Sequence, residues 1–419
     1  MAGSKHHADL LITNAAEVLT CVPIPGDLVG RVRGGSVVVA GERIIAVGPD
    51  ADVRAQVDTT GAMVIDASGK IVAPGFVDSH THLVFGGSRV QEYAAKMTRP
   101  AQEVKALGIP TGILATVEMT RAENLQSLIS SASQRLHRML AHGTTTVESK
   151  SGYGLTVTDE LKLLEVNRRL RSLQPVDVVS TFLGAHDFPR DAPRERYVES
   201  ILDEMIPQVA EQKLAEFCDV FCDDGYYTVA EARRILEAGL AAGLKPKIHA
   251  DQNSAIGATE MAADLGVVSA DHLNYTERGA MRKLAGAGVV GVVTPVLDFA
   301  VKHPRPFDAR AMLAEGMTLA LATDMCPACW VESMQLVMQF ACRQYRLSPE
   351  AALYASTAGG ARALGLTDRG TLAPGQLADI QIWNIPAFEE VIYRLGNNAV
   401  WAVIKRGKVV VGTEGTWGN

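Results

Sequence analysis

The chain has 419 residues, which is longer than one ordinary domain and suits a large barrel with a small accessory module. Hydrophobic residues make up 47% of it and charged residues 21%, so we expect a large buried core rather than global disorder. The net charge of −7 excludes the basic surface typical of a nucleic-acid-binding protein, and an aromatic content of 5% argues against a base-stacking or carbohydrate-binding platform.

Targeting and disulfide signals are absent from the sequence. No apolar stretch approaches the roughly 18 residues of a membrane span, and the first residues lack the basic and apolar regions of a signal peptide. Six scattered cysteines, with close pairs at Cys218/Cys222 and Cys326/Cys329, do not resemble a secreted disulfide framework. We therefore expect a cytoplasmic enzyme with a small-molecule substrate and no nucleic-acid or membrane partner.

The first part of the chain alternates β-branched residues with Gly, Asp and Asn, which predicts short strands at 8–14, 34–48 and 62–75. The middle of the chain instead alternates apolar strands with amphipathic helices, for example 159–173 and 228–243. This alternation predicts a parallel sheet in a (β/α)8 (TIM) barrel. Eight strands can be counted: 71–82, 143–150, 177–186, 218–224, 245–251, 267–273, 288–295 and 319–324.

The C-terminal part of the chain again combines β-branched residues with turn residues, as the first part does. This pattern predicts strands at 377–384 and 401–412. We expect residues 1–70 and 365–419 to form one composite β-sandwich domain and residues 71–364 to form the barrel. Each barrel strand ends in a polar or ionisable residue, and the C-terminal ends of barrel strands share the catalytic face.

Four residues at these strand ends are candidate metal ligands. His80 and His82 are two positions apart, so strand alternation directs both imidazoles to the same side. An isolated His-x-His can equally lie on a surface. Here His249 ends the fifth strand and Asp324 ends the eighth, and three histidines with one carboxylate leave a position open for water on Zn²⁺ or a similar ion.

The motifs that surround these residues identify a family. PGFVDSHTH, the strand-five histidine, DHL on strand six and the strand-eight aspartate resemble the amidohydrolase superfamily. HTHLVFGGSR (80–89), GTTTVESKSGYGL (143–155), QPVDVVSTFLGAH (174–186) and SADHL (269–273) resemble, more specifically, the imidazolonepropionases. The resemblance covers essentially the whole chain. It implies hydrolysis of the cyclic amide 4-imidazolone-5-propanoate to N-formimino-glutamate in histidine degradation.

The resemblance also implies residue roles. His80, His82, His249 and Asp324 would hold one divalent metal, with zinc expected and iron as the alternative. Arg89 and Tyr153 would bind a substrate carboxylate, and His186 would contact the ring carbonyl or its developing oxyanion. Without the family context, Arg89 could be an exposed helix-start residue, Tyr153 a packed rim aromatic and His186 a satisfied rim histidine.

The sequence leaves two possible roles open for each of two further residues, His272 and Lys150. His272 either orients the attacking water or Asp324, or is a buried structural histidine. Lys150 could suggest the carbamylated lysine of two-metal relatives, but those enzymes place it on strand four, so a single metal is favoured.

The chain departs from the family pattern at three places. Gln252 stands where the family has a glutamate that handles the water proton, and glutamine is neither an acid nor a base. The run Met325–Trp330 replaces an Asn-Pro-Gly-Ser loop, and its Cys326 and Cys329 are expected to be packed thiols rather than metal ligands or a redox pair. Gln102 replaces a tyrosine in a segment that covers the pocket.

These departures leave alternatives to the leading function. Asp324 and His272 could share the proton transfer, with Gln252 orienting water or the ring and contributing to substrate binding. The chain could also act on another cyclic or N-acyl amide, or be a catalytically impaired homologue that only binds metal and ligand. A homodimer is expected from the resemblance.

Overall fold

The computed structural model describes residues 6–412, and contacts divide the chain into two units. One unit comprises the chain up to Asp78, Arg138–Thr146 and the chain from Ser333 onward. The other comprises Ser79–His137 and Val147–Glu332. The domain boundaries expected at 70/71 and 364/365 remain predictions.

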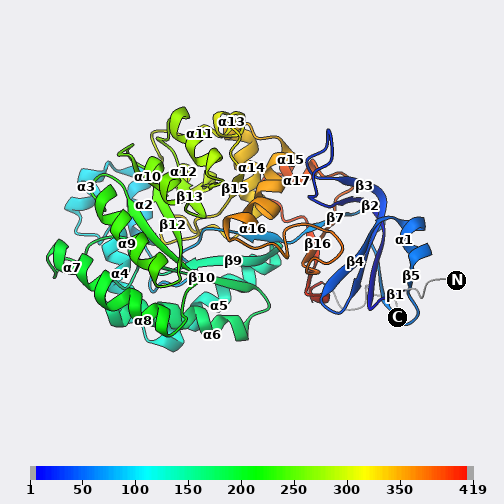
Figure 1. Cartoon of the computed structure of the whole chain (residues 1–419), viewed down its shortest axis with the longest axis horizontal. Coiled ribbons are helices and arrows are strands. Elements are labelled where there is room, and N and C mark those ends of the chain that lie inside the picture. The colour runs from blue at the N-terminus through cyan, green and yellow to red at the C-terminus, as the bar shows by residue number, and fades with distance from the viewer. Residues whose placement is uncertain (1–5, 413–419) are drawn as a thin grey trace. The chain divides into compact units, whose positions relative to one another are not determined.

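An eight-stranded sheet, ordered β15-β14-β13-β12-β11-β10-β9-β8, forms the barrel (Figure 1). The registered pairs along β10–β15 are all parallel. Its strands are β8 (Phe76–Asp78), β9 (Thr144–Lys150), β10 (Asp177–Ala185), β11 (Phe217–Cys222), β12 (Lys245–Ala250), β13 (Ser269–His272), β14 (Val290–Val293) and β15 (Leu319–Leu321). The predicted (β/α)8 class and all eight predicted strand positions are confirmed.

The first predicted strand, 71–82, is in fact two strands. Residues Ile71–Pro74 form β7, which belongs to a different sheet, and β8 begins after Gly75. A Cβ at Gly75 would lie 2.4 Å from the side chain of Thr145, so the close approach of β9 requires glycine at this junction. The break is what lets one continuous segment contribute to both sheets.

Helices alternate with the barrel strands and bury their apolar faces. Two of them begin at side-chain caps that the sequence encodes: Thr156 caps α6, and Thr228 with Glu231 forms a capping box on α9. The helical segments that lie between β8 and β15 are α2 (Val90–Thr98), α3 (Ala101–Ala106), α4 (Gly112–Ala122), α5 (Leu125–Ala141), α6 (Val157–Leu173), α7 (Arg194–Ser200), the π-helix η1 (Ile201–Met205), α8 (Ile206–Glu211), α9 (Val229–Ala241), α10 (Ala258–Leu265), α11 (Arg278–Gly286), α12 (Pro295–Ala300) and α13 (Ala309–Ala314).

The barrel is closed by backbone hydrogen bonds between the segments that follow its first and last strands. The amide of Asp324 donates to the carbonyl of His80 at 3.0 Å, and the amide of His82 donates to the carbonyl of Met325 at 2.9 Å. The two segments that carry candidate metal ligands are therefore held against each other.

Strands from both ends of the chain form the second large sheet, ordered β18-β17-β16-β7-β2-β3-β4, with β6 paired to β2. Residues of both ends enclose one core, for example Ile12 and Val37 with Ile382 and Ile404. The predicted strand-rich domain built from both ends is confirmed. Its strands are β2 (Leu10–Leu19), β3 (Arg31–Ala40), β4 (Arg43–Pro49), β6 (Met63–Asp66), β7, β16 (Ile380–Trp383), β17 (Val400–Lys405) and β18 (Lys408–Val411).

Short elements complete this unit. Helix α1 (Asp50–Gln56) packs Val53 against the sheet, where it joins a small second cluster with Leu11 and Val38. The remaining elements are the two-stranded sheet of β1 (His6–His7) and β5 (Val57–Asp58), together with α14 (Met334–Tyr345), α15 (Pro349–Tyr354), the π-helix η2 (Ala355–Gly359), α16 (Gly360–Ala363) and α17 (Glu390–Tyr393). Over residues 6–412, no helix combines the length and apolar character needed to cross a membrane.

Candidate metal centre and active site

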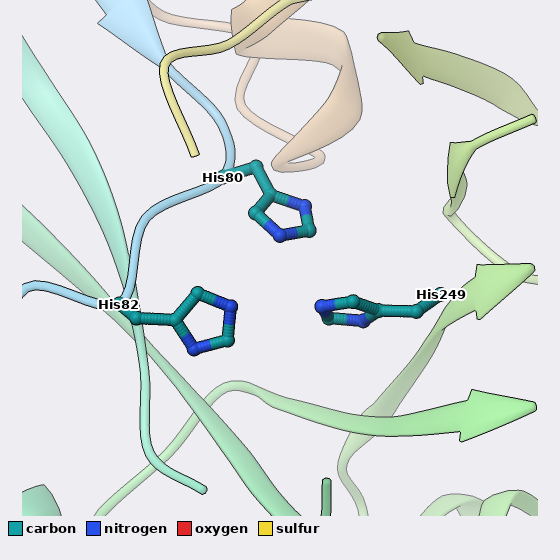
Figure 2. Close-up of side chains that lie close together, drawn as sticks. All are labelled: His80, His82 and His249. Atoms are coloured by element: carbon teal, nitrogen blue, oxygen red, sulfur yellow. The ribbon is translucent and has the colours of Figure 1, made fainter. Parts of the chain in front are cut away.

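Three histidines converge at the C-terminal ends of the barrel strands. His80 and His82 follow β8, His249 is the penultimate residue of β12, and all three are buried. Figure 2 shows their rings directed toward one another from these two segments. One ligand nitrogen from each ring lies within 4.8 Å of the others, which is close enough for all three to bind one ion.

Asp324 and His272 lie beside the three histidines. One carboxylate oxygen of Asp324 is 3.8 Å from the Nε2 atoms of both His80 and His82. His272 forms a second group of candidate ligand atoms within 4.8 Å, with His80 and Asp324. Both Asp324 and His272 have positive φ, +48° and +79°, a strained backbone that recurs at functional sites.

Buried carboxylates orient two of these imidazoles. His80 donates from Nδ1 to Asp271 at 2.6 Å, and His249 donates from Nδ1 to Asp219 at 3.1 Å. Each bond fixes the tautomer whose Nε2 carries a lone pair. The Nε2 atoms of His80 and His249 are buried and have no hydrogen-bond partner among the described residues.

A divalent cation fits this donor set. Burial lowers the pKa of His80, His82 and His249 well below the ordinary value, so the three rings are neutral, as metal ligands must be. Buried, unpartnered nitrogens that converge with a carboxylate would be costly without an ion. The residues present therefore fit one divalent metal.

A buried charge cluster lies directly behind these ligands. Lys150 contacts Asp219 at 2.6 Å, Glu148 at 3.0 Å and Asp271 at 3.3 Å, and Lys247 contacts Glu148 at 2.8 Å. Burial by itself lowers the pKa of Lys150, but the three carboxylates more than offset this and the pKa is raised. Lys150 is thus an ion-paired ammonium on the second barrel strand, and the single metal remains a prediction.

The charges of this cluster do not balance. Burial and the neighbouring Asp271 raise the pKa of Asp219, whereas Lys150 and Lys247 hold the pKa of Asp271 below its usual value despite burial. With all five groups ionised, three carboxylates face two ammonium groups, and the raised pKa of Asp219 shows that this third negative charge is unfavourable. A cation in front of the cluster offsets that charge.

His186 and Tyr153 form one wall of the site. His186 stacks on His82 with 4.7 Å between ring centroids, and Tyr153 lies 5.4 Å from His82 and 5.3 Å from His186 by the same measure. Nδ1 of His186 donates to the carbonyl of Gly152 at 3.1 Å. Burial lowers the pKa of His186 to about 4, so its ring is neutral at pH 7 and Nε2 is an acceptor.

Arg89 precedes α2 and is mostly buried, in contrast to the exposed helix-start alternative. Its Nε and Nη2 atoms donate to the two carboxylate oxygens of Glu92 at 2.5 and 2.8 Å. The end of the guanidinium, formed by Nη1 and the second N–H of Nη2, makes no hydrogen bond to any residue in 6–412. Arg89 is therefore held along one edge and can bind a carboxylate at this free end.

Gln252 lies in the loop after β12 and is half-buried. Its backbone carbonyl contacts Nε2 of His303 at 2.8 Å, and no hydrogen bond involves its side chain within the described ranges. The glutamine is therefore anchored by its backbone, which leaves its amide group available. Gln102 lies on α3 and is exposed.

Cys326 and Cys329 are buried, unbridged thiols. Their backbones pair through reciprocal hydrogen bonds of 3.1 and 3.0 Å, which makes the run 326–329 a tight turn. Burial raises the pKa of both thiols, which keeps them protonated and unlike reactive or metal-binding thiolates. Both cysteines are therefore packed thiols, as expected from the sequence.

Comparison with known proteins decides the family. The profile of the amidohydrolase family matches residues 63–107 and 98–411. The chain belongs to this family. Within the amidohydrolases it is 44% identical to the imidazolonepropionase of Geobacillus kaustophilus over 91% of each chain. It is 41% identical to that of Halobacterium salinarum, over 97% of this chain and 99% of the other. The resemblance identified from the sequence is confirmed.

Solved structures with low sequence identity share the fold. An adenosine deaminase from Xanthomonas campestris with bound zinc superposes with a TM-score of 0.70 at 19% identity, covering 98% of this chain and 94% of the other. An atrazine chlorohydrolase from Arthrobacter aurescens complexed with zinc gives 0.73 at 18% identity, covering 96% and 95%. At these identities the likeness establishes the barrel architecture alone.

The structure brings together the candidate site residues expected in this amidohydrolase except Gln102 and Gln252, for neither of which it gives a contact with the others. Sequence reasoning missed the residues behind the ligands: Glu148, Asp219, Lys247 and Asp271. A signal was present, because charged residues occupy alternate positions within otherwise apolar barrel strands, as in Glu148 and Lys150. Glu92 was missed as well, although it follows Arg89 by three residues at a helix start.

Proposed function

We propose that the chain hydrolyses 4-imidazolone-5-propanoate to N-formimino-glutamate with one divalent metal, and that the metal is zinc. Identity of 40–45% to named imidazolonepropionases over most of the chain supports the substrate. The observation that carries the metal chemistry is the convergence of three neutral imidazoles and one carboxylate at the strand ends. Zinc in distant relatives and the histidine-rich ligand set support the choice of ion.

The reaction is hydrolysis of a ring C–N bond. His80, His82, His249 and Asp324 would hold the ion, which when bound polarises the ring carbonyl and makes water a better nucleophile near pH 7. Asp324 accepts the proton of the attacking water and passes it to the departing ring nitrogen. His272, close to Asp324, keeps that carboxylate and the water oriented.

The substrate is held through its carboxylate and its ring. The free end of Arg89 matches a carboxylate with two parallel hydrogen bonds. Burial raises the pKa of Tyr153, so its phenol stays protonated and can donate a further bond. The neutral tautomer of His186 presents Nε2 as an acceptor and suits a ring N–H of the substrate. Contact with the oxyanion requires the imidazolium form.

Gln252 neither accepts nor releases a proton at ordinary pH. Its amide can donate to the attacking water or accept from the ring, which is a positioning role. In the proposed mechanism, Asp324 therefore performs both proton transfers without help from residue 252.

The test is the loss of 4-imidazolone-5-propanoate, followed by ultraviolet absorbance, with the zinc-loaded chain and its Gln252→Glu variant in parallel. Turnover by the unmodified chain is the expected result. Turnover only by the variant would identify an imidazolonepropionase impaired at one residue. No turnover by either would overturn the proposed substrate.

A second candidate is hydrolysis of another cyclic or N-acyl amide by the same residues. Gln252 and the Met325–Trp330 turn favour it, because both change the site relative to the family pattern. A panel of five-membered lactams, hydantoins and N-acyl amino acids separates the two candidates. The cytoplasmic location and the homodimer remain predictions.

A further inference from the structure

A cavity opens in the barrel unit outside the ring of candidate metal ligands. It has a volume of about 420 Å³, which is in the range of small-molecule sites. Its walls are α2, the end of α12 and the turn at Pro327 and Ala328. No candidate metal ligand lines it, so this cavity is distinct from the metal centre.

The charged residues that line the cavity are mostly cationic. Arg89, Lys96, Arg99 and Lys302 face it, against the single carboxylate of Glu92. This excess of three positive charges stands on a chain whose net charge is −7. A concave surface of one sign, opposite to the sign of the whole protein, concentrates counter-ions of small size.

Two of these cations have no carboxylate partner. Glu92 is 2% exposed and pairs with both Arg89 and Lys96, the latter at 2.5 Å. Arg99 and Lys302, in contrast, form no ion pair with any carboxylate in the described part of the chain. Their charges are therefore available to a ligand.

Arg89 links the cavity to the metal centre. It lines the cavity and is the residue that binds the substrate carboxylate in the proposed function. The turn residues that form another wall, Pro327 and Ala328, follow Asp324 by three and four positions. Arg89 also acts electrostatically on Tyr153, whose ring lies 5.4 Å from that of His82. A carboxylate drawn into the cavity thus reaches Arg89 before it reaches the metal ligands.

We propose that the cavity is a vestibule that captures organic carboxylates through Arg99 and Lys302 and transfers them to Arg89. Glu92 is the positioning residue of this vestibule, because it holds Arg89 by one edge and keeps the free end open. The claim that the vestibule delivers the substrate rests on the proposed function. The claim that it binds carboxylates does not depend on that function.

The first test is direct binding of glutarate, a small dicarboxylate, to the zinc-loaded protein by isothermal titration calorimetry at low salt. An Arg99→Gln/Lys302→Gln variant should bind it about tenfold more weakly, and the difference should vanish above roughly 0.5 M salt as the charges are screened. The matched control is Lys213→Gln/Arg234→Gln, which removes the same charge from exposed positions. Lys213 also shares the left-handed backbone of Lys302, with φ of 52° and 54°.

The second test is steady-state turnover of 4-imidazolone-5-propanoate by the same three proteins. The vestibule variant should show a raised KM and an unchanged kcat, and the control should match the unmodified chain. Equal glutarate affinity in all three proteins, or an equal loss in variant and control, would overturn the vestibule. If no protein turns over the imidazolone but glutarate binding still depends on Arg99 and Lys302, the proposed substrate fails and the vestibule stands.

Discussion

We predict that the carboxylate of Asp271 controls how tightly the metal is bound, and replacing it with asparagine tests this. Its Oδ2 accepts from Nδ1 of His80 at 2.6 Å, with both groups fully buried, and lies 3.3 Å from Lys150. An Asp271→Asn side chain keeps the volume but loses the charge, and its amide can present either an acceptor or a donor to His80. The ring then loses its fixed tautomer and part of its basicity.

Loss of such a carboxylate partner typically lowers metal affinity by about 10- to 100-fold, or roughly 1.4–2.7 kcal/mol. We expect Asp271→Asn to show that loss in competition with a chromophoric zinc chelator at pH 7.5. The control is Asp203→Asn, which removes the same charge from an exposed position. An affinity within twofold of the unmodified chain, with the circular dichroism spectrum intact, would refute the orienting role of Asp271.

Three further outcomes follow from the geometry. Gly152→Ala should lower kcat/KM about 10- to 100-fold, because its Cβ would lie 2.9 Å from the ring of His186 at a φ of +105°. The control is Gly225→Ala, which has a similar φ of +83° but open space around the Cβ, and it should leave kcat/KM unchanged. Lys150→Met should lower the free energy of unfolding in urea, measured without metal, by about 3–5 kcal/mol, since it strands buried carboxylates; a loss below 1 kcal/mol would contradict this. Glu231→Gln should lower the free energy of unfolding at pH 7 by about 1 kcal/mol or less, because solvent screens this partly exposed group. The difference in unfolding free energy between the variant and the unmodified chain should shrink as pH falls from 4.5 toward 2.

The sign of the last prediction follows from the carboxyl group itself. The hydrogen bond from Arg194 is the largest influence on Glu231 and lowers its pKa to about 2, below the ordinary glutamate value of 4.5. The folded state therefore holds the ionised form more tightly than the unfolded state does. This stabilisation is complete above the unfolded pKa and is lost as pH falls through the folded one. A destabilisation that grows toward acid pH would contradict the assignment.

Much of the site could be predicted because its residues follow from strand chemistry. His80 and His82 are separated by two positions at the end of an apolar segment, and His249 and Asp324 end later strands, so barrel topology brings them together. The same logic placed His186 at the end of the third strand. The division of 71–82 into two strands was not predicted, since β7 and β8 are both apolar and only Gly75 separates them.

The interactions behind and beside the site depend on long-range contacts that no local pattern encodes. His80 and Asp271 are 191 residues apart, and the contact of His303 with the Gln252 carbonyl spans 51 residues between two loops. The cationic cavity could not be predicted either, because Lys302 and Arg99 are 203 positions apart and line one cavity only through tertiary packing. Such contacts are set by tertiary packing rather than by propensity.

The most direct test of the central claim is the product formed from 4-imidazolone-5-propanoate in ¹⁸O-labelled water. The zinc-loaded chain should give N-formimino-glutamate that is 2 mass units heavier than the unlabelled product, because one oxygen of the new carboxylate comes from water, and a chelator should abolish its formation. Absence of this product from both the unmodified chain and Gln252→Glu, with zinc bound, would contradict the assignment of this chain as a hydrolase of the imidazolone ring.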